Sequence, residues 1–593
     1  MPEYYQTWRP LLAALICATM AGVTVEAQVP AQDSRNTNIP NTDTHFKARV
    51  YRTLDEWQAR RPQLRRQILA AAGLFPMFQK EDLHAQVFGK ITNRDYTIEK
   101  VQLETLPGYY LGGNLYRPLK PAPAGGFPGI VSPHGHWSYG RLEATPTASV
   151  PARCISMARQ GYVVFAYDMV GYDDTIQTPH DFGAEPEELW DFGPMGLQLW
   201  NSIRAVDFLQ SLPDVNHSRI GAVGASGGAT QTLMLQAVDD RIQFSAPVNM
   251  ISAIMQGGSQ CENAPNLRIG TFNVEIASMM APKPMMMVSA TGDWTRNTPR
   301  EEYPAIRAIY ALYGKPDEVE TQQLDAPHNF NLQNREAVYR FFGKHVLGET
   351  DPALFKEKSI RLEKLQDMLV LSNRKLPDNA LDYQGVRAEW IRMSKAQTDS
   401  ITDHKTLKEM LAASLASEWP AKVVSQVDGE HIVLSRPDVG DRVPGIWIKG
   451  TGQAALVVDP QGAEAARKSS TIQQLIRAGR PVLLIDAFQT GSAVAPRDRS
   501  VRNFLTFNKT DDANRVQDIL TALAFLNSPK AELVGLGKAG IWCQFAAALS
   551  DKPVELKADL NGFTGSDKDF LDQFFIPGIQ RAGGLRTAQL LTR

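Results

Sequence analysis

The nine residues 220–228, IGAVGASGG, decide the fold of this chain. The apolar run Ile220–Val223 is typical of a buried parallel strand, and a segment able to form a helix follows the glycines. Between them lies a G-x-S-x-G sequence, Gly224–Gly228, whose glycines permit a sharp turn from strand to helix. On such a turn the Ser226 hydroxyl stands at the carboxyl end of the strand. The stretch therefore predicts a reactive serine on an α/β sheet, with a glycine-rich packing turn as the alternative.

The same alternation of strand and helix extends along the first half of the chain. Helical segments such as 197–212 separate short apolar runs that end in polar or glycine-rich turns: 129–131, 162–167, 220–223 and 284–288. This alternation predicts a doubly wound, mainly parallel α/β sheet. Upstream, residues 54–74 have helical spacing, and residues 96–117 alternate and turn at Pro107-Gly108, which predicts an antiparallel hairpin.

The second half repeats this order of elements. Three pairs of segments correspond: Val131–Gly135 with Val457–Gly462, Gln160–Asp168 with Ala478–Asp486, and Gly224–Gly227 with Gly537–Gly540. The offset between matching residues falls steadily along the chain, as it would if a second copy kept its elements and shortened its loops. This pattern favours an internal duplication. Chance resemblance between two unrelated α/β domains is the alternative.

The amino-terminal residues predict a secretory signal peptide. Arg9 precedes an apolar stretch, Leu11–Val25, and a small-residue cleavage site ends at Ala27. A membrane anchor is the alternative, but this stretch is shorter than the roughly 20 residues that span a bilayer. We therefore expect a secreted or periplasmic protein that has no membrane association after cleavage.

The expected division of the chain follows from these patterns. It comprises a signal peptide at 1–27; an N-terminal linker, helix and start of a hairpin at 28–105, loose over 28–45; a catalytic domain at 106–348; a helical linker at 349–405; and a degenerate α/β domain at 406–593.

Composition excludes several classes of protein. Of 593 residues, 43% are hydrophobic and 21% charged, which is ordinary for a globular protein and argues against disorder. The formal net charge of -2 gives no electrostatic case for nucleic-acid binding. Signal cleavage would leave three cysteines, Cys154, Cys261 and Cys543. The sequence has no C-x-x-C motif and no Cys/His cluster of metal-ligand spacing. We therefore expect neither a metal nor another cofactor.

A serine nucleophile needs a base and an orienting carboxylate, and in this architecture they follow it in the order Asp or Glu, then His. Within the first half, only His328 and His345 follow Ser226. His328 lies in a loop between a strand and a helix, whereas His345 is expected to be a solvated residue at a helix end. Asp293 ends a strand before His328. We therefore predict a triad of Ser226, Asp293 and His328, with Asp325 as the reserve acid.

The oxyanion that forms during attack on a carbonyl needs donors already in place. Gly227 N–H is one candidate, and His136 N–H, in the loop after the strand 129–131, is the other. Trp137 and Trp294 neighbour these segments in sequence and are candidates for stacking on a sugar ring.

Four segments resemble α/β-hydrolases of the acetyl xylan esterase-like group: Ser132–His136, Gly224–Gly228, Ser289–Thr295 and Pro327–Asn329. The resemblance covers about residues 46–348. It implies the α/β-hydrolase fold, the triad named above and hydrolysis of esters on plant polysaccharide, so that an acylated carbohydrate is the expected substrate.

The second half departs from this pattern. Ala539 occupies the position of the serine, and Gln461 replaces His134. Its histidines, His404 and His431, are both expected ahead of its first sheet strands and not in a triad position, so we expect this half to be catalytically inactive.

Three other functions remain open at this stage. They are a carbohydrate methyl or feruloyl esterase, a serine peptidase of the prolyl-oligopeptidase kind, and a non-catalytic carbohydrate-binding protein. The peptidases carry a β-propeller, and nothing in this chain repeats with the period of propeller blades. A complete triad in the right order argues against the non-catalytic alternative.

Overall fold

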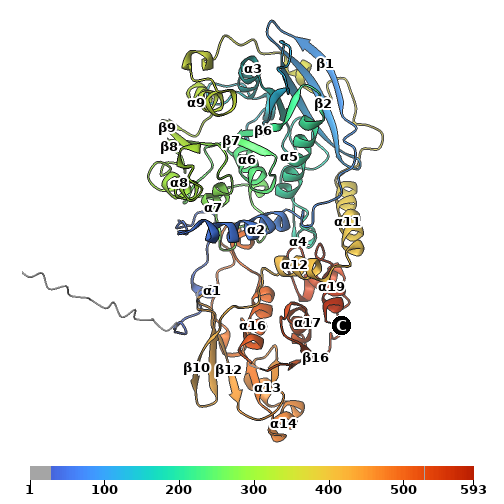
Figure 1. Cartoon of the computed structure of the whole chain (residues 1–593). Coiled ribbons are helices and arrows are strands. Elements are labelled where there is room, and N and C mark those ends of the chain that lie inside the picture. Colours follow the sequence, from blue (N-terminus) through green and yellow to red (C-terminus); the bar gives the residue numbers. More distant parts are fainter. Residues whose placement is uncertain (1–27, 438, 527, 593) are drawn as a thin grey trace, which may run out of the picture.

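The computed structural model describes residues 28–437, 439–526 and 528–592, and the expected signal peptide lies outside them. Two separate sheets, each flanked by helices, lie one above the other (Figure 1). We call each sheet with its helices a unit. The predicted α/β class is confirmed.

The first sheet has the strand order β1-β2-β3-β5-β4-β6-β7-β8-β9. Its strands are β1 (Gln86–Thr92), β2 (Tyr96–Leu106), β3 (Tyr109–Pro118), β4 (Phe127–Val131), β5 (Val163–Tyr167), β6 (Val215–Ala225), β7 (Ile242–Val248), β8 (Met285–Gly292) and β9 (Val319–Pro327). The pairs from β1 to β5 are antiparallel, and every pair beyond them is parallel. The carboxyl ends of β4 to β9 therefore lie along one edge.

The second sheet has the order β10-β11-β12-β14-β13-β15-β16. Its strands are β10 (Val424–Asp428), β11 (His431–Ser435), β12 (Val443–Ile448), β13 (Ala455–Val458), β14 (Val482–Ile485), β15 (Ala531–Gly535) and β16 (Val554–Ala558). This is the order of β1 to β7, including the exchange of the fourth and fifth strands and the change from antiparallel to parallel pairing. A duplication of one α/β unit would produce this shared order.

Helices cover both sheets and join them. In the first unit they are α2 (Leu54–Ala71), α3 (Val150–Gln160), α4 (Glu185–Glu188), α5 (Pro194–Ser211), α6 (Gly227–Val238), α7 (Asn273–Ser278), α8 (Glu302–Leu312) and α9 (Leu332–Phe342). Between the units run α10 (Leu365–Met368), α11 (Tyr383–Ser400) and α12 (His404–Ser414). The second unit has α13 (Ala463–Arg467), α14 (Ser470–Arg477), α15 (Phe504–Phe507), α16 (Asp511–Phe525), α17 (Ala539–Leu549), α18 (Asp567–Gln573) and α19 (Gly584–Leu591). Among the described residues, no helix is long and apolar enough to cross a bilayer.

Helix α2 lies between the two units (Figure 1). Thr53 caps it by accepting a hydrogen bond from Glu56 N–H, and its buried side chains include Trp57, Leu64 and Ile68. The helix contacts α6 and α8 of the first unit and α12 on the way to the second. These apolar side chains belong to one continuous cluster that also includes Phe570 of the second unit. The units therefore share a core rather than meeting at a thin polar contact.

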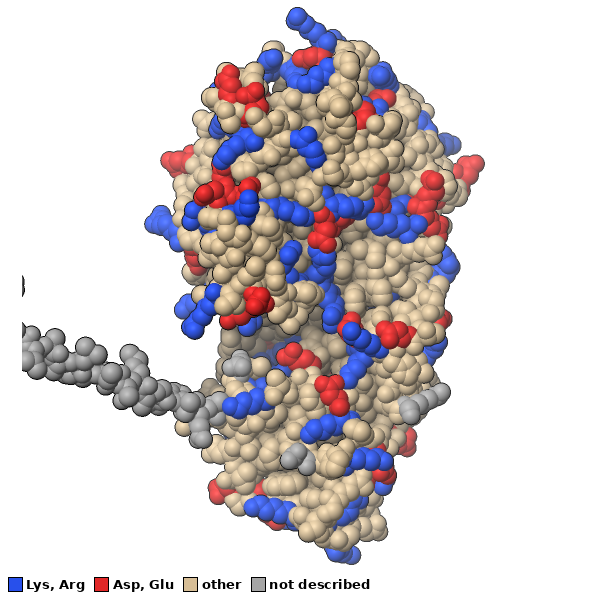
Figure 2. Space-filling model, in the orientation of Figure 1, with Lys and Arg blue, Asp and Glu red and all other residues tan. Residues whose placement is uncertain are grey.

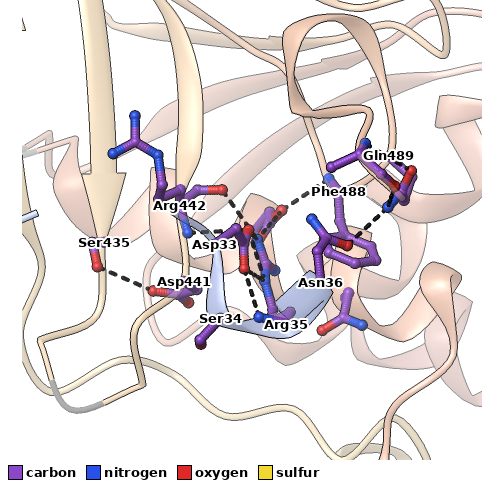
Figure 3. Close-up of polar contacts among 12 residues, drawn as sticks. Asp33, Ser34, Arg35, Asn36, Ser435, Asp441, Arg442, Phe488 and Gln489 are labelled. Atoms are coloured by element: carbon purple, nitrogen blue, oxygen red, sulfur yellow. Dashed lines mark hydrogen bonds and ion pairs between the residues drawn. The ribbon is translucent and has the colours of Figure 1, made fainter. Parts of the chain in front are cut away.

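Residues 28–45 do not form the loose linker expected from the sequence. Residues Ser34–Thr37 form a short helix, α1, that packs on the second unit (Figure 3). The Arg35 guanidinium pairs with Asp33 and with Asp518 of α16, at 2.6 Å in each case. Gln489 Nε2 donates to Asn36 Oδ1 at 2.9 Å. Polar composition suggested a flexible segment, but Arg35 and Asn36 also have partners more than 400 residues away along the chain.

The expected helical linker at 349–405 also packs on the first unit. The N–H groups of Val370 and Leu371 donate to the Asp174 carboxylate, each at 2.8 Å. On α11, fully buried Trp390 donates its indole N–H to the Trp190 carbonyl at 3.0 Å. This segment therefore completes the first unit before the chain reaches the second.

Candidate active site

Ser226 lies at the turn between β6 and α6. Its backbone has φ 56° and ψ −125°, a conformation that residues with a Cβ rarely adopt. Ser226 N–H donates to the Val248 carbonyl at 3.1 Å, which ties the turn to β7. A Cβ on Gly224 would lie 2.3 Å from the Gly228 oxygen, and one on Gly228 would lie 2.6 Å from the Pro133 oxygen. The glycines are therefore needed because backbone passes within contact distance on both sides of the serine.

Asp293 and His328 meet at the same edge of the sheet. Asp293 follows β8 and His328 follows β9, and these strands are parallel neighbours. His328 Nδ1 lies 2.8 Å from Asp293 Oδ2. Thr295 donates both its N–H and its hydroxyl to Asp293 Oδ1, at 2.7 and 2.5 Å. The carboxylate therefore has a fixed orientation, with one oxygen for each neighbour.

The other nitrogen of His328 is free to act on a substrate or a nucleophile. Because the carboxylate accepts from Nδ1–H, Nε2 carries the lone pair. Nε2 is buried and has no hydrogen-bond partner among the described residues, so no bond joins it to Ser226. The Trp294 and Trp137 rings flank the imidazole, with centroids 4.5 and 6.2 Å away. Both tryptophans thus lie at the site, against the predicted base.

Two residues considered from the sequence lie elsewhere. Asp325 is exposed and accepts from the Thr291 hydroxyl at 2.5 Å, so it does not contact the His328 ring. His345 was expected to be solvated at a helix end. Instead, its two nitrogens lie 3.1 Å from Glu318 and from Glu320, and its side chain is 9% exposed.

The loop after β4 approaches the serine turn through two histidines. His134 is fully buried, accepts from Met169 N–H at Nε2 and lies 2.7 Å from the Gly135 oxygen through Nδ1. Burial lowers the pKa of His134 to about 3, so it stays neutral and acts as a structural bridge between loops. The His136 ring packs on Gly227, where an added Cβ would lie 2.5 Å from Cε1.

Both predicted oxyanion donors have unpaired N–H groups. Neither Gly227 N–H nor His136 N–H donates to another group within the described ranges. The packing of His136 on Gly227 brings these two backbone segments together. The sequence predicted only a backbone role for His136, and its side-chain contacts came from the fold.

Two asparagines support the site and were not found from the sequence. Asn249, directly after β7, donates its side-chain amide to the Asn329 carbonyl at 2.8 Å. Asn329 adjoins His328, and its own amide donates to the Pro327 carbonyl at 2.6 Å. Together they fix the loop that carries the imidazole. A lone asparagine after an apolar strand carries no signal for such a role.

The corresponding turn in the second unit differs in shape as well as in composition. The residue with positive φ between β15 and α17 is Gly537, at 51°. Ala539, the sequence counterpart of Ser226, is instead the first residue of α17 and is fully buried. A hydroxyl at this position would point into packed structure rather than stand at the edge of the sheet.

Comparison with known proteins gives a similar picture. No protein-family model matches the chain. A protein of Bacillus subtilis (strain 168) named "Putative hydrolase YtaP" is 26% identical over 261 residues, which are 41% of this chain and 84% of that protein. Among solved structures, "Methylesterase BT1017" is 29% identical, with a TM-score of 0.51, over 59% of this chain and 78% of that one.

A more distant structure is titled a putative acetyl xylan esterase from Bacteroides fragilis NCTC 9343. It is 15% identical, with a TM-score of 0.40, over 48% of this chain and 79% of that one. The nearer likenesses agree with the α/β-hydrolase type of fold predicted from the sequence.

Proposed function

We propose that this protein is a serine carboxylic ester hydrolase that removes acyl groups, acetyl among them, from plant cell-wall polysaccharides or their oligosaccharides. The observation that carries the proposal is the pairing of His328 with Asp293, 2.8 Å apart, at the sheet edge where Ser226 holds a strained turn. The similarity to a protein named a methylesterase supports ester hydrolysis.

In the proposed mechanism, Ser226 Oγ attacks the ester carbonyl while His328 Nε2 takes the hydroxyl proton. Asp293 keeps the proton of His328 on Nδ1 and stabilises the imidazolium that forms. The N–H groups of Gly227 and His136 donate to the oxyanion, as preplaced donors do in this class of reaction. The alcohol leaves with the proton from Nε2, and water then cleaves the acyl-enzyme by the same steps in reverse order.

A methyl ester is the second candidate substrate, because the similar solved structure is named a methylesterase. The two substrates place the carbohydrate differently. With an acetyl ester, the sugar is the leaving alcohol; with a uronate methyl ester, the sugar carries the acyl group bound to Ser226. Trp137 and Trp294 beside His328 would offer apolar faces for a sugar ring in either arrangement.

The experiment is to incubate the mature chain with acetylated and with methyl-esterified polysaccharides and to quantify acetate and methanol. Ser226→Ala should lower kcat for the active substrate by at least about 10³-fold. Thermal unfolding should be unchanged, because the serine hydroxyl has no protein partner among the described residues. More than a tenth of the wild-type activity in this variant would show that Ser226 is not the nucleophile.

A further inference from the structure

Three metal-ligating side chains converge beside the loop that carries the proposed oxyanion donor. His136 lies after β4, His180 after β5, and Cys261 on the 3₁₀ turn Gln260–Glu262. One ligand atom of each residue lies within 4.8 Å of the ligand atoms of the other two. This cluster cannot be recognised from spacing along the chain, because 125 residues separate His136 from Cys261. The expectation of no Cys/His cluster therefore holds for sequence motifs and not for the folded chain.

The cluster leaves one buried imidazole nitrogen without a hydrogen-bond partner among the described residues. His180 Nδ1 lies 2.7 Å from the Val170 carbonyl, to which it can only donate, so Nε2 carries a lone pair. That Nε2 is buried and has no partner among the described residues. His136 Nε2 lies 3.0 Å from Cys261 Sγ. His136 Nε2 and Cys261 Sγ can therefore hydrogen-bond each other, whereas His180 Nε2 stays buried without a partner, at a cost in free energy.

The residues around the cluster orient it as partners of metal ligands do. Val170 accepts from His180 Nδ1 and donates its own N–H to Gln198 Oε1 at 3.2 Å. The Gln198 side-chain nitrogen is also buried and has no hydrogen-bond partner among the described residues. Such outer contacts fix the tautomer of a histidine ligand and the direction of its free nitrogen.

Two carboxylates, those of Asp181 and Glu262, lie near His136, together with the imidazoles of His180 and His328. A second cluster, His134 with Asp168 and Asp173, provides a contrast. There Arg141 is already paired with Asp168, and both nitrogens of His134 have partners, so that cluster needs no further cation.

We infer that His136, His180 and Cys261 form a binding site for a zinc-like divalent cation, and that an ion bound there inhibits the enzyme. Two imidazole nitrogens and one thiolate suit Zn²⁺ and leave one of its four positions open. On binding, the Cys261 thiol gives its proton to solvent and a metal–sulfur bond forms, while both imidazoles stay neutral. The His136 ring packs on Gly227, whose N–H is a proposed oxyanion donor, so an ion held by His136 would act on the oxyanion site. The expected inhibition rests on the proposed function.

The binding test does not depend on activity. The protein is dialysed against a chelator and titrated with Co²⁺, whose thiolate complexes absorb by sulfur-to-metal charge transfer, and then with competing Zn²⁺. We expect one ion per chain. In Cys261→Ala the charge-transfer band should vanish and the affinity should fall by at least about 100-fold, since changes to outer partners alone cost 10- to 100-fold. Cys543→Ala, which removes a buried thiol from α17, is the matched control and should bind as the wild type does.

Two results would overturn the site: no stoichiometric Co²⁺ or Zn²⁺ binding by the wild type, or equal binding by Cys261→Ala. If Cys261→Ala does not fold without metal, His180→Gln takes its place, because a glutamine amide can still donate to Val170. For the inhibitory role, Zn²⁺ should suppress ester hydrolysis reversibly in the wild type and not in His180→Gln. Binding without inhibition would overturn that role alone, and an inactive wild type would refute the proposed function while leaving the titration valid.

Discussion

At the scale of single residues, the site depends on a strained serine and a carboxylate whose two oxygens are both used. The backbone of Ser226 costs about 1–3 kcal/mol, which the surrounding sheet must offset. Asp293 divides its oxygens between His328 and Thr295. Because these hydrogen bonds are short and nearly buried, the imidazole has one tautomer and one orientation.

Asp293→Asn should therefore lower kcat by about 10⁴-fold without unfolding the protein, because an amide can hold the imidazole in the wrong tautomer. Asp325→Asn is the matched control. Asp325 contacts Thr291 rather than the His328 ring, so this variant should keep kcat within a few fold of the wild type. Steady-state ester hydrolysis measures both variants. If Asp325→Asn lost activity and Asp293→Asn kept it, Asp325 rather than Asp293 would be the acid of the triad.

At the scale of elements, short segments with polar sequences join the two units. Helix α1 is only four residues long, yet it places Arg35 against Asp518 of α16. Arg35 also lies over the Phe488 ring, 4.5 Å from its centroid (Figure 3). The Asp518 side chain is fully buried, and Phe488 N–H also donates to it. Removing one partner of such a pair leaves an uncompensated buried charge.

Arg35→Ala should lower the free energy of unfolding by about 3 kcal/mol, measured by urea denaturation. Arg52→Ala, at an exposed position near the same end of the chain, should change it by less than about 0.5 kcal/mol. The double variant Arg35→Ala, Asp518→Asn should recover part of the loss, because the stranded charge is gone. A single variant as stable as Arg52→Ala would show that α1 does not anchor the second unit.

At the scale of the whole molecule, the two units share one core and have cavities between them. Basic and acidic residues are interspersed on the face shown in Figure 2, which is hollowed between the units. One cavity between them, of about 790 Å³, is lined by residues of α1, α2 and α12. Another, of about 600 Å³, is lined by Glu188 of the first unit and Arg499 of the second. The units therefore meet through a shared apolar cluster with two cavities beside it.

Truncation after residue 348 should expose the apolar surface of α2 and lower both solubility and the thermal midpoint. This truncation also removes the contacts of Val370 and Leu371 with Asp174. A second truncation after residue 402 keeps those contacts and α11, so its loss of solubility would measure the second unit alone. If either fragment is as soluble, stable and active on polymer as the full chain, the second unit is an independent module.

The acidic groups at the smaller cavity should make stability depend on pH. Burial, with the neighbouring Glu185 and Glu187, raises the pKa of Glu188 to about 7. Because this pKa lies above the unfolded value of about 4.3, the contribution to stability is complete below that value and is lost as the pH rises through 7. The free energy of unfolding of Glu188→Gln, relative to the wild type, should therefore rise between pH 5 and pH 8. A difference that does not vary with pH would contradict this assignment.

The sequence by itself determined the elements and the candidates for the chemistry. The strand–turn–helix of residues 220–228 and the alternation around it predicted the α/β sheet, because local periodicity reflects which face of each element is buried. In this architecture the acid and then the histidine follow the serine along the chain, which selected Asp293 and His328 as partners of Ser226. The structure places Asp293 and His328 in contact. Whether the three act together stays a prediction.

Only the tertiary structure decided how distant segments meet. Polar composition at 28–45 could not show that Arg35 pairs with a residue 483 positions away, because pairing depends on packing and not on local spacing. The cluster of His136, His180 and Cys261 is likewise absent from the sequence as a motif, since each residue sits in a different loop at one sheet edge. Spacing along the chain encodes contacts within an element; contacts between loops depend on the strand order of the whole sheet.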